Sequence, residues 1–310
     1  MKLIAENLHI ISPKTKEAIL NKDEAFITDL IQRQAKVNPN WIDLNIGPAK
    51  KNYEGSLLWL ATIVEKNTNI PLSLDTANAS EIDAALAKYS NPQECIINSA
   101  SADTTRLEVM SDLAAKYNTY LIALTLNNEI GIPKFADQRL ELAFEIMEVC
   151  SSKDIPNEKI LFDSLILPIC VDQSQANEAI STIRMLKESF DPPTLTTIGL
   201  SNVSNGVTSN LRPLINRVFF TLAAGCGLDS AIVDIFDDEL VRINKLLETR
   251  KIEKDYDKLL LDLFDIMQNF GELEDIEFNK ESKEEVDIYK TAQILLNKKV
   301  YSNSYLDVAI

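Results

Sequence analysis

The chain has 310 residues, with 31 lysines and arginines against 47 aspartates and glutamates, which gives a formal net charge of −16. A balance this acidic argues against nucleic acid or an anionic membrane as partner, because both attract basic protein surfaces. A single histidine, His9, excludes a multi-histidine metal site and, unless it serves alone, a Ser-His-Asp triad. Eight glycines form no phosphate-binding motif. The composition favours a globular protein whose site uses neither histidines nor a glycine-rich loop.

The sequence shows neither a targeting signal nor a membrane-spanning segment. Met1–Ile4 runs straight into Glu6, and no apolar stretch reaches about 18 residues. The four cysteines are scattered in apolar surroundings without a C-x-x-C pair, a pattern typical of buried thiols. We therefore expect a cytoplasmic protein without a metal site.

Short apolar runs recur along the chain and predict β-strands. They are 3–6, 41–46, 71–75, 95–98, 120–126, 160–165, 195–200 and 231–235. Most are continuous and not alternating, which is typical of parallel strands that are covered on both faces.

Amphipathic segments separate these runs and predict helices. Apolar residues recur at helical spacing in 57–64, 82–86, 107–114 and 140–147. Either Asn78 or Ser80 can cap the second of these segments, and either Asp103 or Thr104 the third. Eight strands that are each followed by a helix predict a (β/α)8 TIM barrel in a single domain, 1–310. The competing open, doubly wound sheet usually has fewer strands and a glycine-rich first turn, which is absent here.

One segment departs from the alternation. Residues 272–287 hold eight acidic residues and two lysines. In the preceding segment, 240–270, apolar residues recur at helical spacing. We interpret about 250–285 as a helical and acidic insertion between the eighth strand and the last helix, 288–297. It is either a solvated helical excursion that continues into an acidic loop or a docking surface for a partner.

Polar residues stand where the predicted strands end. They are Glu6, Asn7, Asp43, Asn45, Asp75, Asn98, Asn127, Asp163, Ser201 and Asn202. Carboxylates and amides can hold a hard cation, or they can hydrogen-bond a planar nitrogen heterocycle. Any one of them could instead cap the following helix. Because barrel active sites form at the carboxyl ends of the strands, we expect a site there.

Several motifs carry a family resemblance. They are 41–49 (WIDLNIGPA), 74–78 (LDTAN), 97–99 (INS), 127–134, 162–168 (FDSLILP), 199–204 (GLSNVS) and 212–217 (RPLINR). In this order they resemble the pterin-binding methyltransferases, and most nearly the methyltetrahydrofolate:corrinoid/iron–sulfur protein methyltransferases of the acetyl-CoA pathway. The folate module of methionine synthase and dihydropteroate synthase are more distant. The resemblance covers nearly the whole chain except the insertion.

The resemblance implies a role for each matching position. It implies pterin contacts from Asp75, Asn98, Asp163, Gly199 and Ser201, and contacts to the outer folate from Asn205 and Arg212. Asn202 would approach N5 of the pterin and act in catalysis. An arginine suits an anionic glutamate tail because guanidinium binds carboxylate bidentately.

The implied reaction moves the N5 methyl group of 5-methyltetrahydrofolate to cobalt(I) of a corrinoid carried by a partner, either a corrinoid/iron–sulfur protein or a similar corrinoid protein. The resemblance also implies a homodimer. Apolar residues 219, 220, 222 and 223 are candidates for its interface, or else for buried helix core. Two alternatives stay open: a corrinoid methyltransferase with a different acceptor protein, and a non-catalytic folate-binding or assembly subunit.

The first strand departs from the family pattern, which reads like Gly-Glu-Arg-x-Asn. Glu6 matches, but Asn7 stands in place of the arginine and His9 in place of the asparagine. The substrate is an anion, so we look for basic exceptions to the acidic charge at the barrel mouth, with Lys134, Arg212 and Arg217 as candidates.

Overall fold

A computed structural model of the protein describes residues 1–47 and 53–307. The strands of this part of the chain are β1 (Lys2–His9), β2 (Trp41–Gly47), β3 (Leu72–Thr76), β4 (Ile96–Ser101), β5 (Tyr120–Leu124), β6 (Ile160–Asp163), β7 (Leu195–Thr197) and β8 (Ser230–Val233). Each overlaps one of the predicted apolar runs. Pro48 and Ala49, at the end of the motif 41–49, lie outside the described residues.

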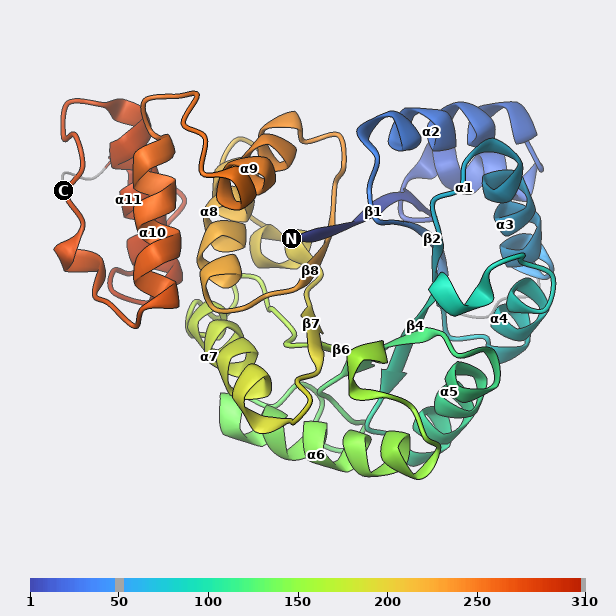
Figure 1. The fold of residues 1–310 in the computed structure, drawn as a ribbon. Helices are drawn as coiled ribbons and strands as arrows, with labels where there is room; N and C mark the ends of the chain where they lie inside the picture. Colours follow the sequence, from blue (N-terminus) through green and yellow to red (C-terminus); the bar gives the residue numbers. More distant parts are fainter. Residues whose placement is uncertain (48–52, 308–310) are drawn as a thin grey trace.

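The strands form one parallel sheet that closes into a barrel. Their order is β7-β6-β5-β4-β3-β2-β1-β8. A parallel bridge between Gly199 and Ile232, with the Ile232 amide donating to the Ile198 carbonyl at 2.8 Å, connects the two edges. The helices surround this sheet (Figure 1). The predicted (β/α)8 TIM barrel is confirmed.

Helices follow the strands as predicted. Within the described residues they are α1 (Pro13–Leu20), α2 (Glu24–Val37), α3 (Ser56–Asn67), α4 (Ala79–Leu86), α5 (Thr104–Tyr117), α6 (Ala136–Ser152), α7 (Ser174–Ser189), α8 (Arg212–Gly225), α9 (Asp238–Thr249), α10 (Asp257–Gln268) and α11 (Lys283–Leu295). Asn78 caps α4, as expected, because its side chain accepts from the Ser80 amide.

The segment after β8 is more deeply packed than the sequence indicated. α9 follows β8 directly, and α10 and α11 lie outside α8 (Figure 1). Leu259, Leu260 and Leu263 of α10 are buried in the same apolar cluster as the α8 side chains. The interpretation of α10 as a solvated excursion is therefore wrong, because one face of this helix is core.

The same packing decides between the two alternatives for the apolar stretch of α8. The side chains of Phe219, Phe220, Leu222 and Ala223 are each 0% exposed in the single chain. They are buried helix core, and they are not available as an interface between two copies.

We propose that residues 1–310 form one domain, to which segment 250–285 is a packed addition. Replacing Leu263, which is fully buried, by alanine should then lower the free energy of unfolding of the whole chain by about 2 kcal/mol. Urea unfolding should still show one transition by fluorescence and by circular dichroism. Two separate transitions, with only the smaller one shifted, would contradict the single domain.

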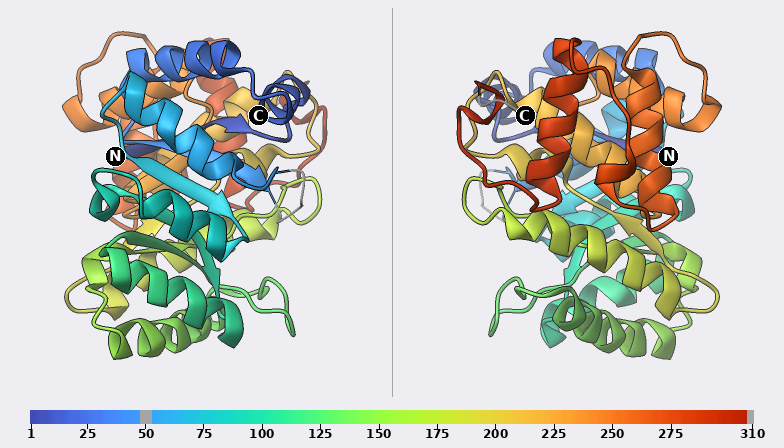
Figure 2. Two further views of the ribbon diagram at one scale, coloured as in Figure 1. Left: turned by 90° about the vertical axis from the view of Figure 1, so that its right-hand side faces the viewer. Right: turned by 90° about the vertical axis from the view of Figure 1, so that its left-hand side faces the viewer.

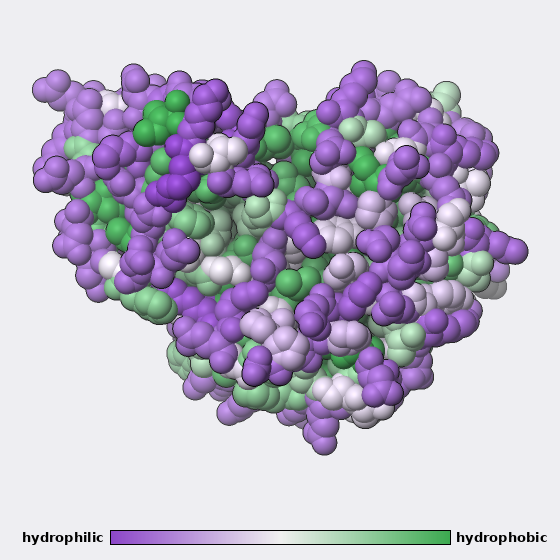
Figure 3. Space-filling view, viewed as in Figure 1, coloured by the Kyte–Doolittle hydropathy of each residue, from purple (hydrophilic) through white to green (hydrophobic). Residues whose placement is uncertain are grey.

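The surface agrees with the acidic composition. Hydrophilic residues dominate the face in Figure 3, and hydrophobic residues occur in small groups between them. No helix in the described part of the chain is long and apolar enough to cross a membrane. Cys95, Cys150 and Cys226 are buried as expected, but the expectation is wrong for Cys170, which is exposed.

Candidate active site at the carboxyl end of the barrel

The barrel interior changes from apolar to polar along the strands. A cluster at one level contains Ile4, Trp41, Ile96, Ile122 and Leu161. Two residues further on, at the positions that share the same face of each strand, stand Glu6, Asp43, Asn98 and Asp163. The strand arrows in the left view of Figure 2 point away from the side where the N-terminus lies. The polar level therefore occupies the carboxyl end of the barrel, where barrel enzymes carry their active sites.

Asp75 lies in a row of polar residues across three strands. Asn45 of β2, Asp75 of β3 and Asn98 of β4 are register partners. The amide of Asn45 donates to Asp75 Oδ2 at 2.5 Å. Burial raises the pKa of Asp75 to about 6, although the Asn45 hydrogen bond and the charge of Arg106 oppose this rise. The structure brings together two of the predicted pterin contacts, Asp75 and Asn98.

Asp43 is a buried carboxylate to which the sequence assigned no role. Its Oδ1 accepts from Ser73 Oγ at 2.6 Å and from Asn98 Nδ2 at 3.3 Å. Burial and the charge of Asp75 hold its pKa well above the usual range. Asp43 therefore orients the Asn98 amide. The sequence placed it among the strand-end polar residues, two positions after the interior Trp41, and the structure adds this orienting contact.

Asp163 ends β6 on the other side of the barrel interior. Its Oδ1 accepts from the Leu165 amide at 2.8 Å. Burial raises its pKa to about 6, while the amides of Leu165 and Gly199 and the charge of Arg139 favour the ionised form. The carboxylate is thus held by backbone donors and keeps lone pairs for a ligand.

Asn202 stands at the mouth with a free amide. It belongs to the short 3-10 helix η4 (Leu200–Ser204) that follows Gly199. Its side chain is exposed, and within the described residues it makes no hydrogen bond through that side chain. A Cβ atom on Gly199 would come within 2.9 Å of Asn202 Nδ2, so the glycine leaves room for this amide. Asn205 is also exposed, and its carbonyl accepts from Cys170 Sγ at 3.2 Å.

Ser201 connects this loop to β1, and Arg212 connects it to α8. Ser201 Oγ donates to Glu6 Oε1 at 2.5 Å, and Arg212 Nε donates to Ser204 Oγ at 3.3 Å. Burial raises the pKa of Glu6, the Ser201 hydrogen bond opposes it, Asp234 adds to the rise and Arg212 lowers it. Arg212 is half-buried and forms no ion pair with a described residue. It remains a candidate for an anionic ligand, whereas Arg217 is already bound to Asp237 at 2.6 Å.

The two departures from the family pattern, Asn7 and His9, both lie in β1, and the structure shows the contacts of each. The Asn7 amide donates to Asp234 Oδ1 at 2.6 Å and accepts from the Ile235 amide at 3.0 Å, which connects the ends of β1 and β8. Burial lowers the pKa of His9, and its buried Nδ1 has no hydrogen-bond partner among the described residues.

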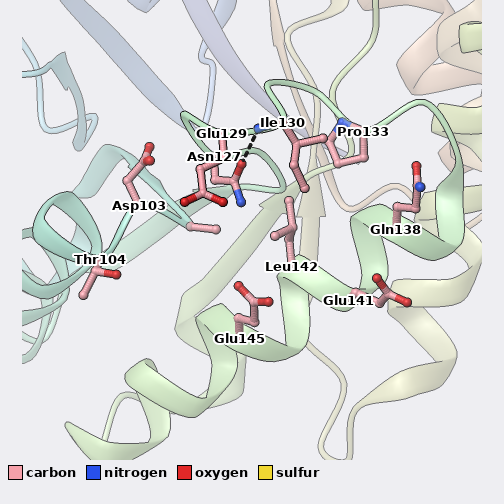
Figure 4. A pocket seen from close by; sticks show the side chains of 11 residues that line it. Asp103, Thr104, Asn127, Glu129, Ile130, Pro133, Gln138, Glu141, Leu142 and Glu145 are labelled. Atoms are coloured by element: carbon pink, nitrogen blue, oxygen red, sulfur yellow. Dashed lines mark hydrogen bonds between the residues drawn. The ribbon is translucent and has the colours of Figure 1, made fainter.

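A separate hollow of about 430 Å³ lies on the rim between α5 and α6 (Figure 4). Asp103, Glu141 and Glu145 line it. Asn127 also lines it, and its side chain accepts from the Ile130 amide at 2.9 Å. Asn127 therefore closes a turn on the rim and does not reach the barrel interior. Among the described residues, no group of three or more histidine, cysteine, aspartate or glutamate side chains could hold a metal ion.

The raised pKa of Asp163 has a consequence for stability. An aspartate whose pKa is about 6 in the folded chain, above its unfolded value, destabilises the fold increasingly as pH rises from about 4 to above 6. Asp163→Asn should therefore raise the free energy of unfolding at pH 8 by about 1–3 kcal/mol. Near pH 4 it should change the stability little. Urea titrations at both pH values measure this, and an equal effect at the two values would contradict the assigned cause.

Comparisons with known proteins identify the family and several relatives of this chain. Residues 52–234 match a family profile described as pterin binding enzyme. The chain is 30% identical to the methylcorrinoid:tetrahydrofolate methyltransferase of Eubacterium limosum, over 76% of this chain and 85% of that protein. It is 26% identical to the methionine synthase of Mycobacterium tuberculosis, over 80% of this chain but 21% of that protein.

The similarity of this chain to solved structures supports the fold alone. The dihydropteroate synthase of Stenotrophomonas maltophilia superposes with a TM-score of 0.57 at 13% identity, over 81% of this chain and 94% of that one. The dihydropteroate synthase of Yersinia pestis, in complex with a pterine-sulfa conjugate, gives 0.56 at 15% identity, over 80% of this chain and 94% of that one. The family profile covers more than half of the chain, and together with the relative from E. limosum it shows that this chain belongs to the pterin binding enzymes.

Proposed function

We propose that this protein transfers a methyl group between N5 of a tetrahydrofolate and the cobalt of a corrinoid carried by a partner protein. The observation that carries the proposal is the exposed amide of Asn202, which has no partner among the described residues, above an interior row of carboxylates and amides. The names of its relatives, a methylcorrinoid:tetrahydrofolate methyltransferase and methionine synthases, support it.

The pterin would bind through its hydrogen-bonding edge. A pterin presents an amino group and ring N–H donors beside a carbonyl acceptor. The carboxylates of Asp75 and Asp163 can accept from these donors, and the amide of Asn98 can donate or accept. Gly199 and Ser201 would line the ring, and Asn205 and Arg212 would contact the outer folate with its anionic tail.

Asn202 would act at N5, where charge develops. When the methyl group passes to cobalt(I), the electron pair of the N5–carbon bond stays on N5, and a proton must neutralise it. In the opposite direction N5 loses that proton and attacks the methyl group. An amide donor at N5 stabilises the negative character in the transition state. Because cobalt(I) is the nucleophile, the protein needs none of its own.

The mouth offers apolar side chains to a partner. Ile11, Ile130, Phe135 and Val171, on loops that follow β1, β5 and β6, are between 50% and 81% exposed, and Val300 is 88% exposed. Val300 lies next to the loop that follows β6, because Gln173 of this loop binds the backbone of Lys299 and Tyr301. We propose that a corrinoid protein docks here, since a corrinoid is too large to enter the barrel.

The identity of that partner is a further part of the proposal. We favour a corrinoid/iron–sulfur protein of the acetyl-CoA pathway, with 5-methyltetrahydrofolate as donor. The name of the E. limosum relative describes transfer in the other direction, and the same site would catalyse both. We also propose a homodimer, to be measured by analytical ultracentrifugation; its contacts must lie outside the buried face of α8.

A spectral assay tests the proposal. The protein is mixed with 5-methyltetrahydrofolate and a reduced corrinoid/iron–sulfur protein, and the loss of the cobalt(I) absorption is followed. In the reverse assay, the methylated corrinoid protein is mixed with tetrahydrofolate. Methyl transfer in either direction is the expected result. Tight folate binding without transfer to any corrinoid protein or to free cobalamin would instead identify a non-catalytic folate-binding subunit.

A further inference from the structure

A fully buried arginine lies behind the candidate site and has no role in the proposed chemistry. Arg139, in the first turns of α6, is 0% exposed. It forms no ion pair with a described carboxylate within 4 Å, and its guanidinium instead meets neutral acceptors. A buried charge without a paired counter-ion is costly. Its retention needs a reason beyond packing.

The acceptors of Arg139 come from three segments that meet beside β6. Nε donates to the Pro133 carbonyl at 3.0 Å, and Nη2 donates to Gln175 Oε1 at 2.5 Å. Nη1 donates to the carbonyls of Ser164 and Leu165 at 2.7 and 2.9 Å. The planar, forked guanidinium can satisfy all of these at once, which a lysine cannot.

The contact with Leu165 leads directly to the site. Leu165 has a φ of +55°, a left-handed conformation that is strained for a residue with a branched side chain. This turn aims the Leu165 amide back at Asp163 Oδ1, at 2.8 Å. Arg139 holds the carbonyl of the same residue, so it stabilises the turn that orients the Asp163 carboxylate.

The positive charge of Arg139 also favours the ionised form of Asp163. Two charged groups face it, Asp163 from β6 and Glu178 from α7. Glu178 is already engaged, because its Oε2 accepts from the Ala136 amide at the start of α6. Burial raises the pKa of Asp163, and Arg139 is the charged group that opposes this rise.

We propose that Arg139 is a positioning residue of the pterin site, which fixes the Leu165 turn and through it keeps the Asp163 carboxylate oriented and ionised for a ligand. This inference rests on the proposed binding of the pterin by Asp163. The buried arginine would then act on the ligand only through Asp163.

The test is the affinity for 5-methyltetrahydrofolate, measured by calorimetry between pH 5 and 8. In the wild type the affinity should fall as pH decreases through about 6, because the protonated acid accepts fewer hydrogen bonds. Arg139→Met should move this fall to higher pH by about one unit, since an adjacent positive charge has been removed. Arg139→Lys keeps the charge and should keep the midpoint, with some loss of affinity.

Two comparisons make the result specific. In the Asp163→Asn background, Arg139→Met should lower the affinity for 5-methyltetrahydrofolate by less than about twofold further, because Arg139 acts only through Asp163. Arg184→Met is the control: Arg184 of α7 stacks on Phe270 and should leave the pH profile unchanged. If Arg139→Met does not fold, as judged by circular dichroism, Arg139→Gln provides the neutral variant.

The outcomes separate this inference from the proposed function. An unchanged midpoint in the neutral Arg139 variant, or an equal loss in the Asp163→Asn background, overturns the role of Arg139. Unchanged affinity in Asp163→Asn alone overturns the pterin site itself.

Discussion

Replacing Asn202 by alanine should lower the rate constant of methyl transfer by about 10²–10³, because it removes a donor aimed at a developing charge. The dissociation constant of 5-methyltetrahydrofolate should rise by less than about tenfold, since an interaction that strengthens in the transition state affects the rate more than the binding. Single-turnover stopped-flow measurements of the cobalt spectrum give the rate, and equilibrium titration gives the binding. The side chain has no partner within the described protein, so its loss leaves no protein group unpaired.

Two variants on the same loop serve as controls. Asn210, in the segment between η4 and α8, is also exposed, and Asn210→Ala should leave the rate constant almost unchanged. Gly199→Ala should lower the rate without removing any donor, because its Cβ would lie 2.9 Å from Asn202 Nδ2 and displace that amide. Wild-type turnover in Asn202→Ala would remove the residue from the catalytic role.

The strands and the polar residues at their carboxyl ends could be predicted because both depend on local sequence patterns. A continuous apolar run specifies a strand that is covered on both faces, and a polar residue two positions beyond an interior apolar one faces the same interior. Asp163 follows Leu161 in this way, and Asn98 follows Ile96. The family resemblance then supplied the roles that a pattern cannot specify.

Other features could not be predicted because they depend on the packing of distant segments. Arg139 resembles any helix arginine in the sequence, and its acceptors are carbonyls from two loops and the side chain of Gln175 in α7. The apolar face of α10 predicted a helix, but only the folded chain shows that this face covers α8. Asn127 follows a strand as the site residues do, yet its side chain closes a turn with Ile130.

Asp163→Asn should weaken the binding of 5-methyltetrahydrofolate at pH 7.5 by about 10²-fold, because hydrogen bonds to a charged acceptor contribute about 1.5–3 kcal/mol each. An asparagine also presents an N–H where the ligand presents donors. Calorimetric titration measures the loss. Asp172→Asn, on the loop after β6, removes one negative charge from the mouth without touching the barrel interior and should change the affinity little.

The pH dependence identifies the carboxylates responsible. With pKa values of about 6, Asp75 and Asp163 are ionised at pH 7.5 and protonated at pH 5. Wild-type affinity should therefore be constant above pH 7 and fall below pH 6. In Asp163→Asn the remaining dependence belongs to Asp75. The same substitution is expected to stabilise the fold at high pH, so a loss of affinity at pH 7.5 cannot come from unfolding. A variant that is more stable and binds less well would show that the buried carboxylate is kept for the ligand at a cost to the fold.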